Sequence, residues 1–316
     1  MGDISSATLN YQLTNYAQGL MNDLAASRAL AERLAPSTPV PGTSGQFKKF
    51  NDKNSFMPED TARATGGDPK VIGFSASDDT YSCKPQALEV RVDKSELDAA
   101  GSNSGAVGQQ LLREGKVGAM LNKASLSHTV QVITAVLAGV TAQTGPNRGQ
   151  WSNPDIDPID QLDEQLDGLT LDCGSSSNLA LTLDVGSWRA LRNHPRVKAR
   201  CTGVQVGGIT SEQLKGLLML PVDVFIAAIV KDTTGLGVTA SKVRALSSVA
   251  LIHYMVPNPT IYDPSPFKTF TVGMGSPFGG VRSYNALNGL WEGHVIDWSR
   301  DIHQTSTLSM RRLNIN

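Results

Sequence analysis

The sequence predicts a fold of mixed helices and strands, with an extended N-terminal arm and a long polar stretch after it. Three observations predict this: apolar residues at helical spacing in residues 10–34, alternating short segments after residue 70, and β-branched apolar runs in the second half. Hydrophobic residues make up 40% and charged residues 18% of the 316 residues, which is typical of a globular chain. At roughly 150 residues per domain, we expect one to two domains.

Residues 10–34 form the first predicted helix, because their apolar positions follow the 3.6-residue period. Either Asn10 or Thr14 can cap it, and Pro36 ends it. Residues 35–45 contain three prolines and two glycines, so they should run extended with few backbone hydrogen bonds of their own. A helix on such a tether is better suited to reach a neighbour than to build a compact core.

Short strands are predicted at residues 71–77 and 87–92, on either side of a turn. Before them lies a polar stretch, residues 57–69, which reads as an exposed tip. On sequence alone, an ordinary solvated loop is the favoured interpretation of this stretch. Charges of both signs occur in or beside it, at Glu59, Asp60, Arg63, Asp68 and Lys70.

Residues 105–137 form a second long helix whose continuity is weakened by Gly115 and Gly118. Three shorter helices are predicted from their capping residues. They begin after Asp157, after Asp184 and after Thr210, which has Gln213 as its capping-box partner.

Strands are predicted in six further segments. Residues 179–183, 222–230 and 250–256 read as strands, the last two buried; residues 267–287 read as turns and edge strands; residues 291–298 and 305–314 read as strands paired with each other. Asp232 and the five residues after it read as a turn.

The sequence offers little support for an enzyme. It has no G-x-S-x-G elbow, no phosphate-binding glycine loop and no H-E-x-x-H motif, and its five histidines are scattered. His253 lies in an apolar run and is expected to be a hydrogen-bonded buried residue. The acidic cluster at residues 155–164 lacks the calcium-loop pattern and reads as a solvated helix N-terminus. We therefore expect no catalytic, cofactor-binding or metal-binding residues.

The net charge and the length of the apolar runs argue against two further classes of protein, nucleic-acid-binding and membrane-spanning proteins. The 28 Lys and Arg against 29 Asp and Glu leave a net charge of −1, so nonspecific binding of nucleic acid is not expected as the main activity. No apolar run reaches the roughly 18 residues of a membrane span, and the start lacks a signal-peptide pattern. We expect a soluble, unexported protein whose Cys83, Cys173 and Cys201 are reduced thiols.

Four segments, in this order, resemble the major capsid proteins of tailed bacteriophages. Residues 13–50 resemble the opening helix, the proline-containing arm and a Gly-x-Phe-x-Lys step. Residues 72–93 resemble a strand of that family with a characteristic signature. Residues 151–200 resemble a tryptophan-proline block that is followed by a strand and a W-R-A-L-R-x-H-P helix. Residues 209–230 resemble the segment that follows this helix in the family. The matching positions are Asp79, Tyr81, Cys83, Ala87, Leu88, Trp151, Pro154, Asp157, Pro158, Ile159, Trp188, Arg189, Leu191, His194 and Pro195.

The resemblance implies the α+β fold first seen in phage Hong Kong 97. It assigns residues 1–50 to an N-terminal arm and residues 51–92 to an extended loop. Residues 93–198 and 281–316 would form a peripheral domain with a long spine helix, and residues 199–280 an axial domain. We expect Glu59, Asp60, Arg63 and Lys70 in the extended loop to form ion pairs between subunits.

The function that the resemblance implies is structural rather than enzymatic, with no cofactor. Copies of the chain would assemble as hexamers and pentamers into the icosahedral shell of a virion, in the host bacterial cytoplasm, around double-stranded DNA held without sequence-specific contacts. Further implied partners are a portal, decoration proteins and, where one is needed, a separate scaffolding protein; no membrane is implied.

Two alternatives stay open: an encapsulin-like nanocompartment shell, and a soluble enzyme with an unfamiliar site. Some relatives cross-link a lysine to an asparagine. Lys53, Lys70 and Lys84 lie in the corresponding region, but no pair is identified, and non-covalent locking is favoured.

Overall fold

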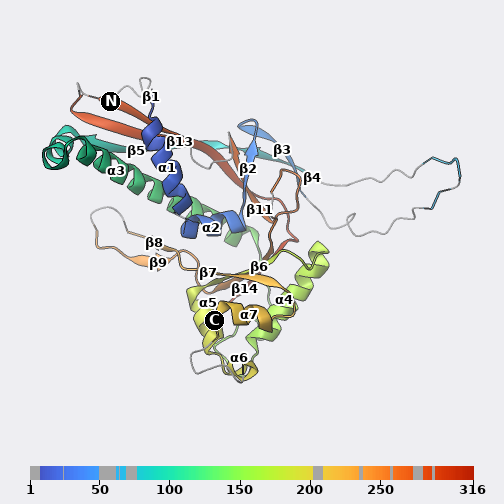
Figure 1. The fold of residues 1–316 in the computed structure, drawn as a ribbon. Helices are drawn as coiled ribbons and strands as arrows, with labels where there is room; N and C mark the ends of the chain where they lie inside the picture. The colour runs from blue at the N-terminus through green and yellow to red at the C-terminus, as the bar shows by residue number, and fades with distance from the viewer. Residues whose placement is uncertain are drawn as a thin grey trace. The chain divides into compact units, whose positions relative to one another are not determined.

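The computed structural model describes residues 8–23, 25–49, 62–63, 65–68, 77–201, 209–234, 238–256, 259–272, 280–286 and 289–316. The chain divides into two compact units. Unit 1 is Met1–Gly45, Tyr81–Val132 and Thr269–Ile302, and unit 2 is Gln46–Thr80, Ile133–Lys268 and His303–Asn316. Helices and strands occur in both, which confirms the predicted α+β class (Figure 1).

The units divide the chain at other positions than the domains implied by the resemblance. Residues 133–198 and 303–316, expected in the peripheral domain, belong to unit 2. The expected domain division stays a prediction.

Unit 1 is built on a six-stranded sheet around one long strand, β13 (Trp291–Gln304). The strand order is β1-β12-β13-β11-β2, and β5 pairs with β13 from Trp291 opposite Asp93 to Arg300 opposite Lys84. The other strands of this sheet are β1 (Thr8–Leu9), β2 (Ser37–Val40), β5 (Lys84–Asp93), β11 (Phe267–Val272) and β12 (Val281–Ala286).

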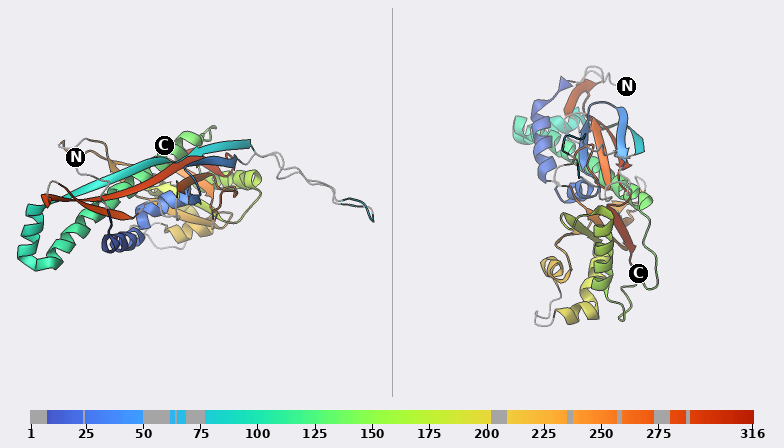
Figure 2. Two further views of the ribbon diagram at one scale, coloured as in Figure 1. Left: turned by 90° about the horizontal axis from the view of Figure 1, so that it is seen from above. Right: turned by 90° about the vertical axis from the view of Figure 1, so that its right-hand side faces the viewer.

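Three helices accompany this sheet: α1 (Tyr11–Asp23), α2 (Ala25–Leu34) and the long α3 (Lys94–Gly139). Asn10 caps α1, because its Oδ1 accepts from the Leu13 amide at 3.1 Å, whereas the Thr14 hydroxyl bonds with Val281. The helix α3 runs along β5 and β13 (Figure 2). A buried cluster joins α1, α3, β12 and β13 through Leu13, Ala17, Val117, Met120, Leu121, Ala124, Val281 and Ile296.

The long helix departs from its prediction at the N-terminal end. It begins at Lys94 and stays helical through Gly115 and Gly118, but Ser104 and Gly105 have non-helical dihedral angles. Gly105 has φ +61° and ψ −147°, a region open to glycine and costly for other residues. The break therefore lies at the start of the predicted helix, not at the glycines inside it.

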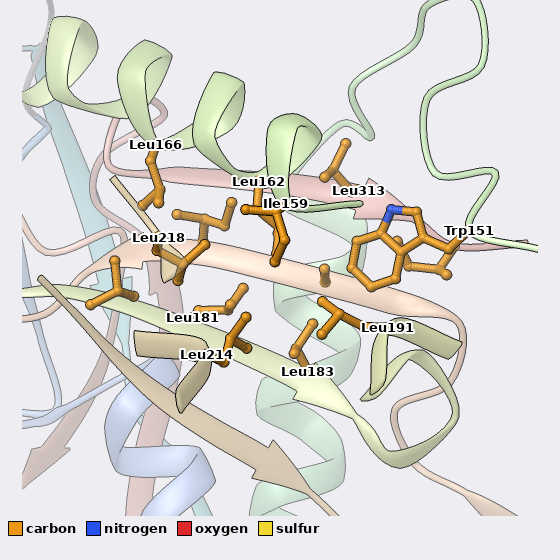
Figure 3. Packing of buried hydrophobic residues seen from close by; sticks show 14 of the residues in the cluster. Trp151, Ile159, Leu162, Leu166, Leu181, Leu183, Leu191, Leu214, Leu218 and Leu313 are labelled. Carbon is orange, nitrogen blue, oxygen red and sulfur yellow. The ribbon is translucent and has the colours of Figure 1, made fainter. Parts of the chain in front are cut away.

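Unit 2 contains a four-stranded sheet in the order β14-β10-β6-β7. The strands are β6 (Leu179–Asp184), β7 (Val222–Ala227), β10 (Val249–Tyr254) and β14 (Met310–Asn314), and the helices are α4 (Pro158–Cys173), α5 (Val185–Asn193), α6 (Pro195–Arg200) and α7 (Ser211–Leu217). Asp157, Asp184 and Thr210 cap α4, α5 and α7 as predicted. The core between helices and sheet is shown in Figure 3; it includes Trp151, Ile159, Leu162, Leu166, Leu181, Leu183, Leu191, Leu214, Leu218 and Leu313.

Two small two-stranded sheets contain the remaining described strands. β3 (Ser44–Lys49) pairs with β4 (Ser77–Ser82), and β8 (Val230–Asp232) pairs with β9 (Lys242–Arg244).

The two C-terminal strands do not pair with each other, so that prediction is wrong. β13 pairs with β5 and β12, whereas β14 pairs with β10. In the segment between them, the Thr305 amide donates to the Pro266 carbonyl at 3.0 Å and the Ser309 hydroxyl donates to the Pro264 carbonyl at 2.7 Å. These bonds hold the segment against residues 264–266, which prevents a hairpin turn.

The strands in residues 267–287 are interior strands, not the predicted edge strands. β11 lies between β13 and β2, and β12 lies between β1 and β13. Their outer neighbours come from the N-terminal arm, whose prolines predict few backbone hydrogen bonds. The arm nevertheless joins the sheet, because β2 pairs in parallel with β11 and places Pro39 in an edge strand, where a missing N–H is tolerated.

The prediction of one buried strand over residues 222–230 is wrong. β7 ends at Ala227, and only its two end residues are fully buried. β7 is the edge strand of its sheet, which explains why an apolar sequence stays half-buried there.

Candidate assembly surfaces

The charges predicted to pair between subunits fall mostly outside the described residues. Glu59, Asp60 and Lys70 lie there, as do Lys53 and residues 71–76 of a predicted strand. Arg63 is described and is exposed to solvent. The described structure therefore does not bring these four charges together.

The strands β3 and β4 flank the first part of the segment expected to form the extended loop. Lys48 and Asp78 form an ion pair there, but both side chains are about half exposed, so it adds little stability. A Cβ on Gly45 would lie 2.6 Å from the Tyr81 hydroxyl, so β3 needs glycine at this position. The Tyr81 ring in turn packs on Phe270, with centroids 4.9 Å apart. The aromatic residue of the capsid-like signature is thus a packing residue.

Cys83, also part of that signature, is a buried structural thiol. Its amide donates to the Thr43 carbonyl at 2.7 Å, and its Sγ lies 3.5 Å from the Phe270 carbonyl oxygen. Burial, with a smaller contribution from the charge of Asp301, raises the pKa of the thiol. A thiol held in the neutral form is a poor nucleophile.

A bidentate ion pair fixes α3 to the long strand of unit 1. Arg113 Nε and Nη2 donate to the two carboxylate oxygens of Glu292 at 2.7 and 2.9 Å, and both side chains are about three-quarters buried. The hydrogen bonds from Arg113 hold the pKa of Glu292 below its usual value. Beside the pair, His294 is buried, and burial lowers its pKa. A rigid, planar pairing of this kind positions the helix on the strand.

A second arginine is buried more deeply in unit 1. Arg300 is 2% exposed, donates to Gln131 Oε1 at 3.0 Å and lies over the Trp298 ring at 5.5 Å. Burial lowers its pKa to about 10.

The acidic cluster of residues 155–164 mainly serves local structure. Asp157 caps α4 and also accepts from Arg200 at 2.6 Å. Asp163 accepts from the Met219 amide at 3.0 Å, and burial raises its pKa. Glu164 pairs with Arg148. The interpretation as a helix N-terminus is confirmed for Asp157.

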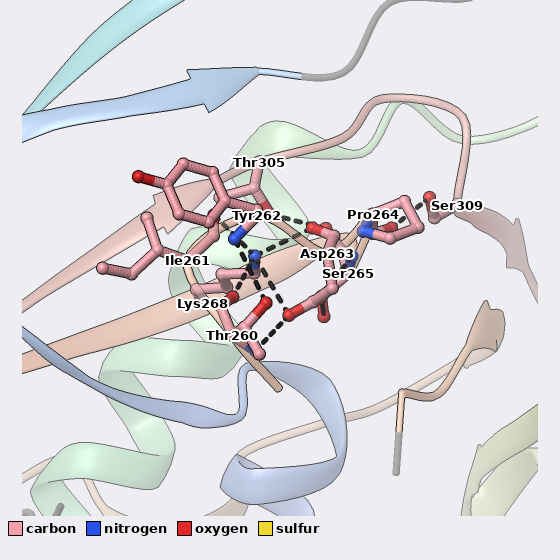
Figure 4. A network of polar contacts seen from close by, with 9 residues as sticks. All are labelled: Thr260, Ile261, Tyr262, Asp263, Pro264, Ser265, Lys268, Thr305 and Ser309. Atoms are coloured by element: carbon pink, nitrogen blue, oxygen red, sulfur yellow. Dashed lines mark hydrogen bonds and ion pairs between the residues drawn. The ribbon is translucent and has the colours of Figure 1, made fainter. Parts of the chain in front are cut away.

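A buried lysine organises the loop before β11 in unit 2 (Figure 4). Lys268 Nζ donates to the carbonyl oxygens of Thr260, Ile261 and Asp263 at 2.6, 3.2 and 2.8 Å, and its side chain is fully buried. Burial lowers its pKa, which the Asp263 carboxylate 3.3 Å away partly offsets. All three ammonium protons are used within the loop, so this lysine is structural.

The β8–β9 hairpin is not predicted from the sequence, because residues 222–230 have the pattern of one strand followed by a turn. The signal was present as two short alternating segments, Val230-Lys231-Asp232 and Lys242-Val243-Arg244, around a Thr/Gly/Ser-rich connection. Only the start of the turn predicted at residues 232–237 lies within the described residues: Asp232 Oδ1 accepts from the amides of Thr234 and Ser241 at 2.9 and 3.1 Å.

His253 is fully buried with its Nε2 3.3 Å from the Thr182 hydroxyl, as predicted. Within the described ranges no three His, Cys, Asp or Glu side chains gather as metal ligands, and no helix has the length and apolar character needed to cross a bilayer. An open groove of about 370 Å³ beside β5 and β13 contains Asp297 as its single ionisable side chain.

Comparison with solved structures identifies this architecture. A phage-related protein from Bordetella bronchiseptica RB50 aligns over 97% of both chains with a TM-score of 0.72 at 20% identity. The capsid protein of cyanophage P-SCSP1u aligns over 90% of this chain and 87% of its own, with a TM-score of 0.55 at 10% identity. The chain has the Hong Kong 97-like fold.

The Hong Kong 97-like fold is shared by shells of different origin. The SrpI encapsulin of Synechococcus elongatus PCC 7942 aligns over 91% of this chain and 86% of its own, with a TM-score of 0.51 at 11% identity. At such identities structural similarity establishes the fold alone.

Sequence comparison adds a named relative. The major capsid protein of Pseudomonas phage JBD67 is 24% identical over 172 residues, which are 54% of this chain and 53% of the relative. The match thus spans about half the length of either protein. No family model matches the chain.

Proposed function

We propose that this chain is the major capsid protein of a tailed phage, a structural protein that assembles into the virion shell. The observation that carries the proposal is a Hong Kong 97-like fold over nearly the whole chain, together with sequence similarity to a phage major capsid protein. The contacts described above agree with this role, because they fix helices, strands and loops in place.

Assembly proceeds through hexamers and pentamers that close into an icosahedral shell around double-stranded DNA. Many weak interfaces add up to a stable particle in such shells. The peripheral and axial domains are proposed at residues 93–198 with 281–316 and at residues 199–280. A portal, decoration proteins and a separate scaffolding protein are the proposed partners, and the host bacterial cytoplasm is the proposed place of assembly.

The test is sedimentation and negative-stain microscopy of the protein, expressed alone and with the products of neighbouring genes. Capsomer rings or closed shells are the expected result. A strictly monomeric species in both preparations would contradict the proposal. Particles that contain protein cargo and no DNA would favour the encapsulin-like alternative.

The extended loop is proposed to join neighbouring subunits through Glu59, Asp60, Arg63 and Lys70, without a covalent cross-link. Replacing all four by serine should reduce the yield of particles, because complementary charges fix the register of an interface. The yield is measured by sedimentation, and circular dichroism confirms the folded monomer. Serine at the Lys48–Asp78 pair, between β3 and β4, is the matched control. An unchanged yield after the fourfold substitution would exclude these ion pairs.

A further inference from the structure

The β8–β9 hairpin is a ribbon without a third strand among the described residues. Val230 lies opposite Arg244, Lys231 opposite Val243, and the ribbon follows β7 after two residues. A two-stranded hairpin is at best marginally stable in water on its own. A partner surface would therefore stabilise it.

The hairpin presents both apolar and positive surface. Val230 and Val238 are 44% and 65% exposed. Lys242 and Arg244 are exposed and share one face of the ribbon, about 7 Å apart, since they are two residues apart in one strand. Neither forms an ion pair with any part of the chain that the structure describes. Two unpaired cations beside apolar side chains are typical of an interface that awaits a negative partner.

A row of exposed acidic residues lies on α4 in the same unit. Asp160, Glu164, Asp167 and Leu171 are exposed and follow spacings of four, three and four residues, so they form one stripe along the helix. Glu164 is engaged by Arg148, but the carboxylates of Asp160 and Asp167 have no partner within the described residues. Leu171 is 74% exposed.

The spacing of the two surfaces is compatible. Asp160 and Asp167 are seven residues apart, or about 10.5 Å along the helix axis. Lysine and arginine side chains extend several ångströms from the backbone, so cations about 7 Å apart can reach both carboxylates. The exposed Leu171 at the end of the stripe provides apolar surface for the valines of the hairpin.

The two surfaces lie on opposite sides of unit 2. The hairpin continues from β7, at one edge of the sheet, whereas α4 packs on β10 and β14, toward the other edge (Figure 1). A surface on one side of a subunit that complements a different surface on the other side generates a head-to-tail contact. Such contacts close into rings when the rotation between subunits fits.

We propose that the β8–β9 hairpin of one copy binds the acidic stripe on α4 of the next copy around a capsomer ring. Lys242 and Arg244 pair with Asp160 and Asp167. This inference rests on the proposed capsid function. The partner that binds the hairpin is a second copy of this chain, because the chain itself carries the complementary charge on the opposite side of the same unit.

The test reverses the charges on one side at a time. One variant carries Lys242→Glu and Arg244→Glu, and the other carries Asp160→Lys and Asp167→Lys. Each variant alone should form rings at least about tenfold less well than the unchanged protein, because like charges then face each other. Asp155→Lys with Glu212→Lys is the control: it reverses two exposed acids of unit 2 away from the stripe and should assemble normally.

Mixing the two reversed variants is the decisive step. Each contact between unlike variants again joins opposite charges. The yield of rings of six, in which the two variants alternate, should therefore return to within about twofold of the yield of the unchanged protein. Rings with an odd number of subunits cannot alternate, so pentamers and closed shells should not return. Folding of each variant is established by circular dichroism before mixing.

Other results would overturn the inference. If either reversed variant still forms rings, or if mixing fails to restore them, the hairpin does not bind α4. Loss of DNA retention after hairpin reversal, with ring formation intact, would assign the hairpin to nucleic acid instead. Failure of the unchanged protein to assemble would contradict the capsid function itself, which is a separate outcome.

Discussion

Replacing Asp184 by alanine is expected to lower the free energy of unfolding by about 3–5 kcal/mol. The carboxylate is 1% exposed and accepts from the amides of Gly186 and Ser187 at 2.7 and 3.3 Å, and from the Ser187 hydroxyl. It also accepts from the Val249 amide at 3.1 Å, which ties the cap of α5 to β10. Alanine removes the cap and leaves buried donors without an acceptor. Chemical unfolding of the unassembled chain, followed by circular dichroism, measures the loss.

The matched control is Asp157→Ala, at the same capping position of α4. Asp157 accepts from one helix amide, that of Ile159, and from the partly exposed Arg200. Water can replace these partners, so the expected loss is about 1 kcal/mol. Equal losses for the two alanine variants would show that burial does not set the contribution of Asp184.

Gly149→Ala is expected to destabilise unit 2 by about 2–4 kcal/mol. Gly149 has φ +73°, and a Cβ there would lie 1.7 Å from the Asn314 carbonyl oxygen. Its own carbonyl accepts from the Asn316 amide at 2.8 Å, and its amide donates to Gln161 at 3.0 Å. The methyl group would force the C-terminal strand away from this turn. Hydrogen exchange measured by mass spectrometry should show faster exchange in β14.

Gly115→Ala is the control for this substitution. Gly115 lies inside α3, and a Cβ there meets nothing within 4 Å. Alanine should stabilise the chain by about 0.5–1 kcal/mol, because it has the higher helix propensity. A loss of stability at Gly115, or unchanged stability after Gly149→Ala, would contradict the steric argument.

The helix starts in unit 2 could be predicted because the interactions that set them are local. Asp157, Asp184 and Thr210 each accept from amides within three residues, so residue type and spacing were sufficient. The same holds for the start of the turn at Asp232. The mixture of helices and strands, including the strands β5, β6 and β10, followed from local patterns of apolar residues.

The candidate surfaces were predictable only as charge patterns. The residues of the extended loop were selected for their signs, and the structure describes Arg63 among them. The acidic residues of α4 read as helix chemistry, which holds for Asp157, but their outward stripe depends on which face of α4 packs on the sheet. The hairpin was missed because its six residues are too few for a clear period.

The sequence by itself determined where α4, α5 and α7 begin and that no motif for catalysis is present. Only the tertiary structure decided which strands pair. Thr8 lies opposite Ser283, and Ser37 opposite Thr269, across more than two hundred residues. The physical reason is that a helix is closed by bonds four residues apart, whereas a strand satisfies its N–H and C=O groups with whichever strand the whole fold brings beside it.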